Sequence, residues 1–132
     1  MDIFQKIVAW NKERGILDTD FDHVKEVSFI VEELLESTGK YDSITARDRA
    51  ATYAKEIVET PCLDKEVIVD AFADIIVFAT GAIAKNGYDP SKVMEEVHKE
   101  INSRTGTLVD GKFVKDKDAK IYKADLKACC TK

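Results

Sequence analysis

The sequence is poor in the residues that break regular structure: its 132 residues include 6 Gly and 2 Pro. This shortage excludes collagen-like repeats and Gly/Pro-rich low-complexity chains. Cysteine is also scarce: the chain has only Cys62, Cys129 and Cys130, an odd number with no CxxC motif. A disulfide-stapled secreted scaffold is therefore excluded, and we expect reduced thiols in a cytoplasmic protein.

The chain has no excess of basic residues. Twenty Lys and Arg stand against 25 Asp and Glu, which gives a net charge of −5, so no overall field attracts a nucleic acid polymer or a membrane. We expect no signal peptide, because residues 1–5 contain no basic region followed by an apolar run. One long apolar stretch, 67–84, contains Asp70 and Asp74, and each would cost about 2.5–3.5 kcal/mol in lipid. We predict that this stretch is a buried helix of a soluble protein.

The residues that are present favour an all-α fold. Apolar residues make up 45% of the chain and charged residues 34%, enough for one domain with a real core. Asp22 (or Asp20), Asp64 and Asp89 are candidate helix N-caps. Apolar periodicity predicts about five helices around a four-helix core, over residues 3–14, 22–38, 45–59, 64–86 and 90–104. We assign 1–106 to this helical domain and 107–132 to an extended, basic C-terminal arm with a turn at Asp110-Gly111.

Two of the predicted helices carry acidic patterns. Glu32, Glu33 and Glu36 lie opposite the apolar arc of helix 22–38, while Asp70 and Asp74 share one face of helix 64–86. If the two faces meet, they form an oxygen-rich cluster of the kind that Mg²⁺ or Mn²⁺ prefers. Two simpler interpretations remain open: a solvated acidic face for the glutamates, and an ion pair with Lys or Arg between helices for the aspartates.

The acidic patterns match known motifs. Glu32-Glu33-Leu34-Leu35-Glu36 matches the EExxE signature of the MazG-like all-α nucleoside triphosphate pyrophosphohydrolases, and residues 70–76 resemble their second acidic motif. The similarity continues through 87–89 and 97–102. The tail resembles the phosphoribosyl-ATP pyrophosphohydrolase-like branch, so that the resemblance covers about residues 22–126.

This resemblance implies Mg²⁺-dependent cleavage between the α- and β-phosphates of a (deoxy)nucleotide, giving a nucleoside monophosphate and pyrophosphate. It points to Glu33, Glu36 and Asp74 as metal ligands. Glu32 would be a further ligand, or the residue that orients or deprotonates the attacking water. The second motif usually has Glu three residues before the Asp, and this chain has Ala71 there. Asp70 is the natural substitute as a ligand, with Glu66 in reserve.

Candidate substrate contacts lie outside the acidic motifs. Lys99 and Asn102 match basic and amide positions of the family, which implies that they hold phosphate or sugar. Trp10 and Asn11 can contact a base, although a Trp on an amphipathic helix is more often a core residue. The arm also contains basic residues that can close over phosphates or remain solvated. These are Lys112, Lys120 and Lys123. Both a nucleoside triphosphate and phosphoribosyl-ATP remain open as substrates.

Parts of the sequence are compatible with two other functions. Glu95 and His98 have the Glu-x-x-His spacing of ferritin-like di-iron bundles, but the second such pair is missing. A non-catalytic helical module, nucleotide-sensing or oligomerising, would instead pair the acidic cluster with Arg47, Arg49 or Arg104 of a neighbour. Such a module would show no divalent-metal dependence. We also expect a homodimer or homotetramer, because the apolar surface exceeds what five short helices can cover.

Overall fold

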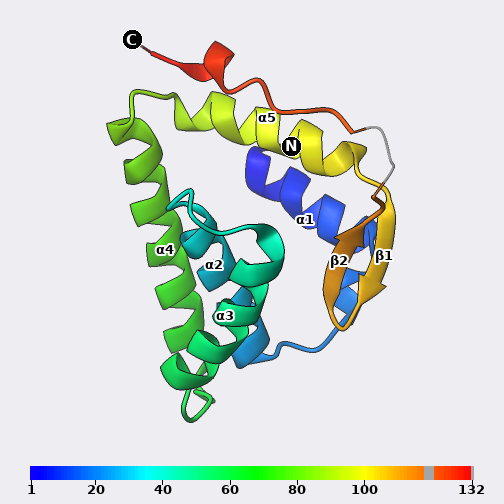
Figure 1. Cartoon of the computed structure of the whole chain (residues 1–132), viewed down its shortest axis with the longest axis vertical. Coiled ribbons are helices and arrows are strands. Elements are labelled where there is room, and N and C mark those ends of the chain that lie inside the picture. The colour runs from blue at the N-terminus through cyan, green and yellow to red at the C-terminus, as the bar shows by residue number, and fades with distance from the viewer. Residues whose placement is uncertain (118–120, 132) are drawn as a thin grey trace. The chain divides into compact units, whose positions relative to one another are not determined.

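The computed structural model describes residues 1–117 and 121–131 and is helical apart from one small sheet (Figure 1). The five predicted helices are confirmed, with ends within about three residues of those predicted. The helices are α1 (Ile3–Glu13), α2 (His23–Glu36), α3 (Ser43–Ile57), α4 (Lys65–Lys85) and α5 (Pro90–Ser103). Short 3₁₀ helices cover Ile16–Asp18 and Lys127–Cys129, and the strands are β1 (Gly106–Val109) and β2 (Lys112–Lys115).

Aspartate side chains fix where the helices begin. Asp22 accepts a hydrogen bond from the Lys25 backbone N–H, and Asp89 accepts one from Ser91, as the sequence predicted. Asp64 accepts a hydrogen bond from the Glu66 backbone N–H at 3.0 Å. Each such cap satisfies an N–H group that the first turn of a helix leaves without a partner.

The chain divides into two compact units, residues 20–71 and residues 1–19 with 72–132. In the first unit, α2 packs against α3. Ala46, Ala50 and Ala54 are at most 1% exposed and form a stripe along α3, with Val31 of α2 also buried. Small side chains let two helices approach closely, so this stripe brings the polar residues beside it near α2.

In the second unit, α1 packs against α5. The Trp10 indole N–H donates to the backbone oxygen of Ile101 at 3.0 Å, and the Trp10 ring meets Phe113 of β2 edge-on with centroids 5.7 Å apart. Arg14 lies over the Trp10 ring at 4.8 Å. These contacts tie β2 to the two helices of this unit.

The C-terminal arm is more ordered than the extended tail predicted from the sequence. Strands β1 and β2 pair antiparallel, with Gly106 opposite Lys115. The predicted turn is confirmed at Asp110-Gly111, where both residues have positive φ, 52° and 82°. Gly106 is required at its position, because an added Cβ would lie 2.1 Å from the Val114 carbonyl oxygen. After the hairpin, the chain runs back along α5 (Figure 1).

The prediction that α4 is buried was wrong for the single chain. None of its residues is buried, and large apolar side chains such as Phe78 (77% exposed), Val69 and Val77 lie at the surface. Helix α4 is long and apolar enough to cross a membrane by length and composition alone. The apolar pattern correctly predicts a helix, but none of its residues is buried in the described part of the chain.

Candidate functional site

The glutamates of the EExxE motif gather on α2. Glu32, Glu33 and Glu36 each offer a carboxylate oxygen, and these oxygens all lie within 4.8 Å of one another. The spacing explains this, because residues three and four apart lie on one face of a helix. Carboxylate oxygens held this close repel one another unless a cation lies near them. The cluster is therefore a group that can hold a metal ion.

The three glutamates differ in burial. Glu32 is only 6% exposed, whereas Glu33 is exposed and Glu36 is partly exposed. The Nε atom of Arg47, from α3, lies 3.7 Å from Oε1 of Glu32. A buried carboxylate needs a partner of opposite charge or a set of hydrogen bonds. The non-catalytic module would take Arg47 from a neighbour, whereas in this structure Arg47 pairs with Glu32 of the same chain.

Glu26 lies about one and a half turns before Glu32 on α2 and is partly buried. Burial, together with the nearby charge of Asp22, raises the pKa of Glu26 above its ordinary value. Both causes disfavour the charged form of the carboxyl group. Glu26 is not among the ligands predicted from the sequence.

Asp70 and Asp74 lie on α4, four residues apart, so they share one face of that helix. Both are exposed, as is Glu66, the reserve ligand. Asp70 belongs to the unit of residues 20–71 and Asp74 to the other unit. Their meeting with the glutamates of α2 stays a prediction.

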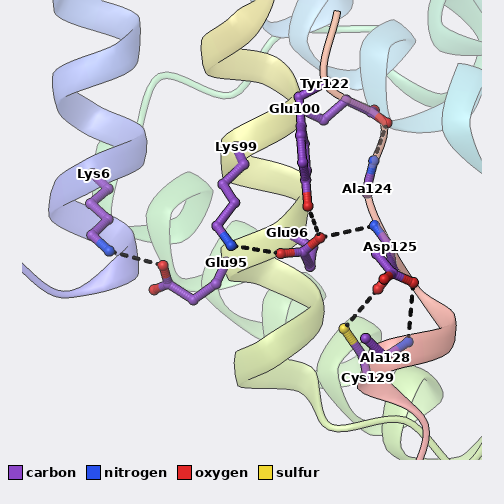
Figure 2. A network of polar contacts seen from close by, with 10 residues as sticks. All are labelled: Lys6, Glu95, Glu96, Lys99, Glu100, Tyr122, Ala124, Asp125, Ala128 and Cys129. Atoms are coloured by element: carbon purple, nitrogen blue, oxygen red, sulfur yellow. Dashed lines mark hydrogen bonds and ion pairs between the residues drawn. The ribbon is translucent and has the colours of Figure 1, made fainter.

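A second group of carboxylates lies on α5 (Figure 2). Lys99 donates to Glu96 at 2.8 Å, and the hydroxyl of Tyr122 donates to the same carboxylate at 2.5 Å. The backbone N–H of Asp125 donates to Glu96 at 2.9 Å. Hydrogen bonds from Lys99, Tyr122 and Asp125, in this order, lower the pKa of Glu96 from 4.5 to about 2. Glu96 is therefore ionised at any ordinary pH.

The α5 carboxylates fasten the C-terminal segment, residues 121–131, to the helix. Besides the bonds to Glu96, the backbone N–H of Ala124 donates to Glu100 at 3.0 Å. Farther along, the N–H of Thr131 donates to the Gly87 carbonyl at 2.7 Å. Sequence analysis missed Glu96 and Glu100 in this role. Their i, i+4 spacing was a signal that they share a face, but it does not reveal what they bind.

Most predicted substrate residues have partners within the chain. Lys99 pairs with Glu96. Next to this pair, Lys6 of α1, which is not one of the predicted substrate residues, pairs with Glu95 at 2.8 Å (Figure 2). The Asn11 side chain donates to the Ile7 carbonyl of its own helix, and Trp10 is engaged with Ile101 as described above. Their contact with a nucleotide stays a prediction.

The remaining candidates lie at or near the arm. Asn102 is exposed and its backbone oxygen accepts from Arg14 at 3.1 Å. Lys112 lies on β2 and is half-buried, while Lys123 is exposed in the C-terminal segment. Lys120 lies outside the described residues. The structure thus gathers the three α2 glutamates, whereas a phosphate-binding role for these lysines stays a prediction.

The three cysteines are free thiols, as expected from their number and spacing. Cys129 is 2% exposed, and its Sγ donates to the Asp125 carbonyl at 3.5 Å. Burial raises the pKa of the Cys129 thiol, with a further contribution from the charge of Glu96. A raised pKa keeps the thiol protonated and unreactive, so Cys129 serves the packing of the C-terminal segment.

A helical fold with clustered glutamates on one helix is typical of the MazG-like class of all-α nucleotide pyrophosphohydrolases, and the family comparison agrees. A family model described as phosphoribosyl-ATP pyrophosphohydrolase matches residues 19–101, more than half of the chain. The chain belongs to this family, which indicates a pyrophosphohydrolase-type activity on nucleotides. No curated protein and no solved structure matches the chain.

The matched residues include the α2 cluster, the two aspartates of α4 and Lys99. They end before β1, so the hairpin and the C-terminal segment lie beyond the match. The family match therefore does not test the resemblance of the tail to the phosphoribosyl-ATP pyrophosphohydrolase-like branch.

Proposed function

We propose that this protein is a divalent-metal-dependent nucleotide pyrophosphohydrolase that cleaves the bond between the α- and β-phosphates. The products are a nucleoside monophosphate and pyrophosphate. The observation that carries the proposal is the group of three α2 carboxylates within 4.8 Å of one another, inside the residues that match the family. A pyrophosphohydrolase must neutralise several phosphate charges, and a metal held by carboxylates does so.

The donor set suits Mg²⁺, with Mn²⁺ as a substitute, because both are hard cations that prefer carboxylate oxygens. Glu33 and Glu36 are the first ligands we assign, with Asp74 and Asp70 completing the set. When bound, the metal polarises the phosphate oxygens and lowers the pKa of a bound water. This donor chemistry also explains why three acidic side chains gather on one face of α2.

Residues of the chain carry the remaining steps. Glu32 orients the attacking water and accepts its proton at a carboxylate oxygen, while Lys99 and Asn102 hold phosphate or sugar. A bond forms between the water oxygen and the α-phosphorus, and the bond from that phosphorus to the bridging oxygen breaks. The bridging oxygen leaves with pyrophosphate. Trp10, Asn11 and basic residues of the arm are assigned to base and phosphate contacts, namely Lys112, Lys120 and Lys123.

Activity on a substrate panel tests the proposal. The purified protein is incubated with ribo- and deoxynucleoside triphosphates and with phosphoribosyl-ATP in the presence of Mg²⁺, and both products are measured. We expect equal amounts of monophosphate and pyrophosphate from at least one substrate, and none after EDTA treatment. Release of single phosphates, or turnover that persists in EDTA, would contradict the proposal.

The alternative is a non-catalytic helical module that senses nucleotides or oligomerises. The ion pair between Arg47 and Glu32 favours it, because one carboxylate of the cluster already has a cation beside it. Divalent metal separates the two functions. The module would neither bind Mg²⁺ at the α2 cluster nor release pyrophosphate from any substrate on the panel.

We further propose that the protein is a cytoplasmic homodimer or homotetramer and binds no membrane. Exposed apolar residues on α4, among them Val69, Val77 and Phe78, support an assembly because a second copy would cover them. Light scattering is expected to give at least twice the monomer mass. A stable monomer would contradict the assembly, and co-sedimentation with phosphatidylcholine vesicles would contradict a soluble protein.

A further inference from the structure

Arg47 is the positively charged residue beside the buried carboxylate of the α2 cluster. Its Nε atom lies 3.7 Å from Oε1 of Glu32. The Arg47 side chain is 52% exposed, whereas the Glu32 side chain is 8% exposed. The two residues come from different helices, α2 and α3, which pack through the alanine stripe of α3. The packing of this unit therefore fixes where the backbone of Arg47 lies beside α2.

An ion pair between two exposed side chains contributes little, because water screens both charges. This pair is different, because the Glu32 side chain is largely withdrawn from water, so its charge is screened less. A guanidinium on one side of such a carboxylate restricts the direction in which its oxygens point. Arg47 also adds one positive charge beside three carboxylates, which weakens their combined attraction for a divalent cation.

We infer that Arg47 is a positioning residue for the proposed hydrolysis: it orients Glu32 toward the attacking water and lowers the affinity of the α2 cluster for metal. The inference rests on the proposed function and assigns a role to a residue outside both acidic motifs. The inference gives the three glutamates different roles: Glu33 and Glu36 bind the metal, and Glu32 orients the water.

If Arg47 has this role, removing its positive charge should raise the affinity for Mg²⁺ and lower kcat. In Arg47→Met, the cluster loses a nearby positive charge, so Mg²⁺ should bind about two- to fivefold more tightly, as expected for a partly screened charge. Glu32 loses its orientation, so kcat should fall by roughly tenfold or more. A residue that only stabilised the fold would weaken both metal binding and turnover.

The chain offers a matched control on the same helix. Arg49 is also exposed on α3, but its guanidinium faces Tyr41, at 5.3 Å from the ring centroid. Arg49→Met should leave Mg²⁺ affinity and kcat unchanged. Arg47→Lys keeps the charge with a different shape, so it should retain the wild-type Mg²⁺ affinity and recover part of kcat.

The experiment measures Mg²⁺ binding by calorimetry without nucleotide, and kcat and KM with the best substrate of the panel. Thermal unfolding of all four proteins shows whether each variant is folded. The inference is overturned if Arg47→Met matches Arg49→Met, or if folded Arg47→Met binds Mg²⁺ more weakly. Failure of the proposed function is distinguishable, because wild-type protein would then neither bind Mg²⁺ nor turn over substrate, which removes the role of Arg47 as well.

Discussion

Two helices of this protein carry groups of glutamates, and the two groups have different surroundings. On α5, Glu95, Glu96 and Glu100 each receive hydrogen bonds from a cationic side chain: Lys6, Lys99 and Arg104 respectively. On α2, Glu32, Glu33 and Glu36 lie close to one another, with Arg47 beside the first. The α5 glutamates thus bind other parts of their own unit, and those of α2 form a group suited to a cation.

The difference lies in what each helix has beside it. Lys99 and Arg104 follow Glu96 and Glu100 by three and four residues, so α5 carries its own counter-charges. Tyr122 and the backbone of the C-terminal segment add further donors. Similar spacing of Glu residues therefore gives a structural cluster in one unit and a candidate metal site in the other.

The largest expected effect is on turnover, in Glu36→Gln. This change keeps the shape of the side chain but removes one charge from the α2 cluster, so activity should fall by at least ~100-fold. Pyrophosphate release is the measurement. The matched control is Glu95→Gln on α5, which should keep activity within a factor of about two. Equal losses in both variants would remove the distinction between the two groups.

The next effect is on stability, in Ala50→Leu. Ala50 is 1% exposed between α2 and α3, so a larger side chain should cost about 1–3 kcal/mol of unfolding free energy by overpacking. It should also displace Arg47 from Glu32 and reduce turnover. The neighbouring Ala51 is exposed, and Ala51→Leu should change neither property in denaturant unfolding or kinetic assays.

A smaller and local effect is expected in Glu96→Gln. The amide loses the charge that holds Lys99, Tyr122 and the Asp125 N–H, so the C-terminal segment should open more often. Hydrogen exchange at the Asp125 amide should accelerate several-fold, while Mg²⁺ binding should stay as in wild type. Unchanged exchange would show that the segment is held by other contacts.

The smallest expected effect is a pH dependence of the docking of the C-terminal segment on α5. The folded state lowers the pKa of Glu96 to about 2, so the ionised carboxylate stabilises the docked segment fully above pH about 4.5. This stabilisation decreases as the pH falls from 4.5 toward 2. The Asp125 amide followed by NMR should lose protection over that window and keep it from pH 5 to 8. Loss of protection only above pH 5 would contradict the assignment to Glu96.

Local features were predictable from the sequence because they depend on neighbours a few residues away. Apolar periodicity and the caps at Asp22, Asp64 and Asp89 gave the helix bounds. The EExxE spacing placed the three glutamates on one face of α2. The Asp110-Gly111 turn followed from the left-handed backbone that such residues tolerate.

Features that depend on distant segments could not be predicted. The docking of residues 121–131 on α5 joins Tyr122 to Glu96, which are 26 positions apart in the chain. The sequence around neither residue predicts this contact. The pairing of Arg47 with Glu32 needs the packing of α2 on α3. The exposure of α4 was not predicted for a related reason. An apolar helix indicates that its surface packs against something, but its sequence does not show which segment or chain that is.

Metal binding to the two acidic groups tests the central claim most directly. Mg²⁺ is titrated by calorimetry into the wild-type protein, Glu36→Gln and Glu96→Gln without nucleotide. Wild type and Glu96→Gln should bind Mg²⁺ with the same affinity, and Glu36→Gln should show weak binding or none. Binding that survives in Glu36→Gln but is lost in Glu96→Gln would contradict the assignment of the metal site to α2.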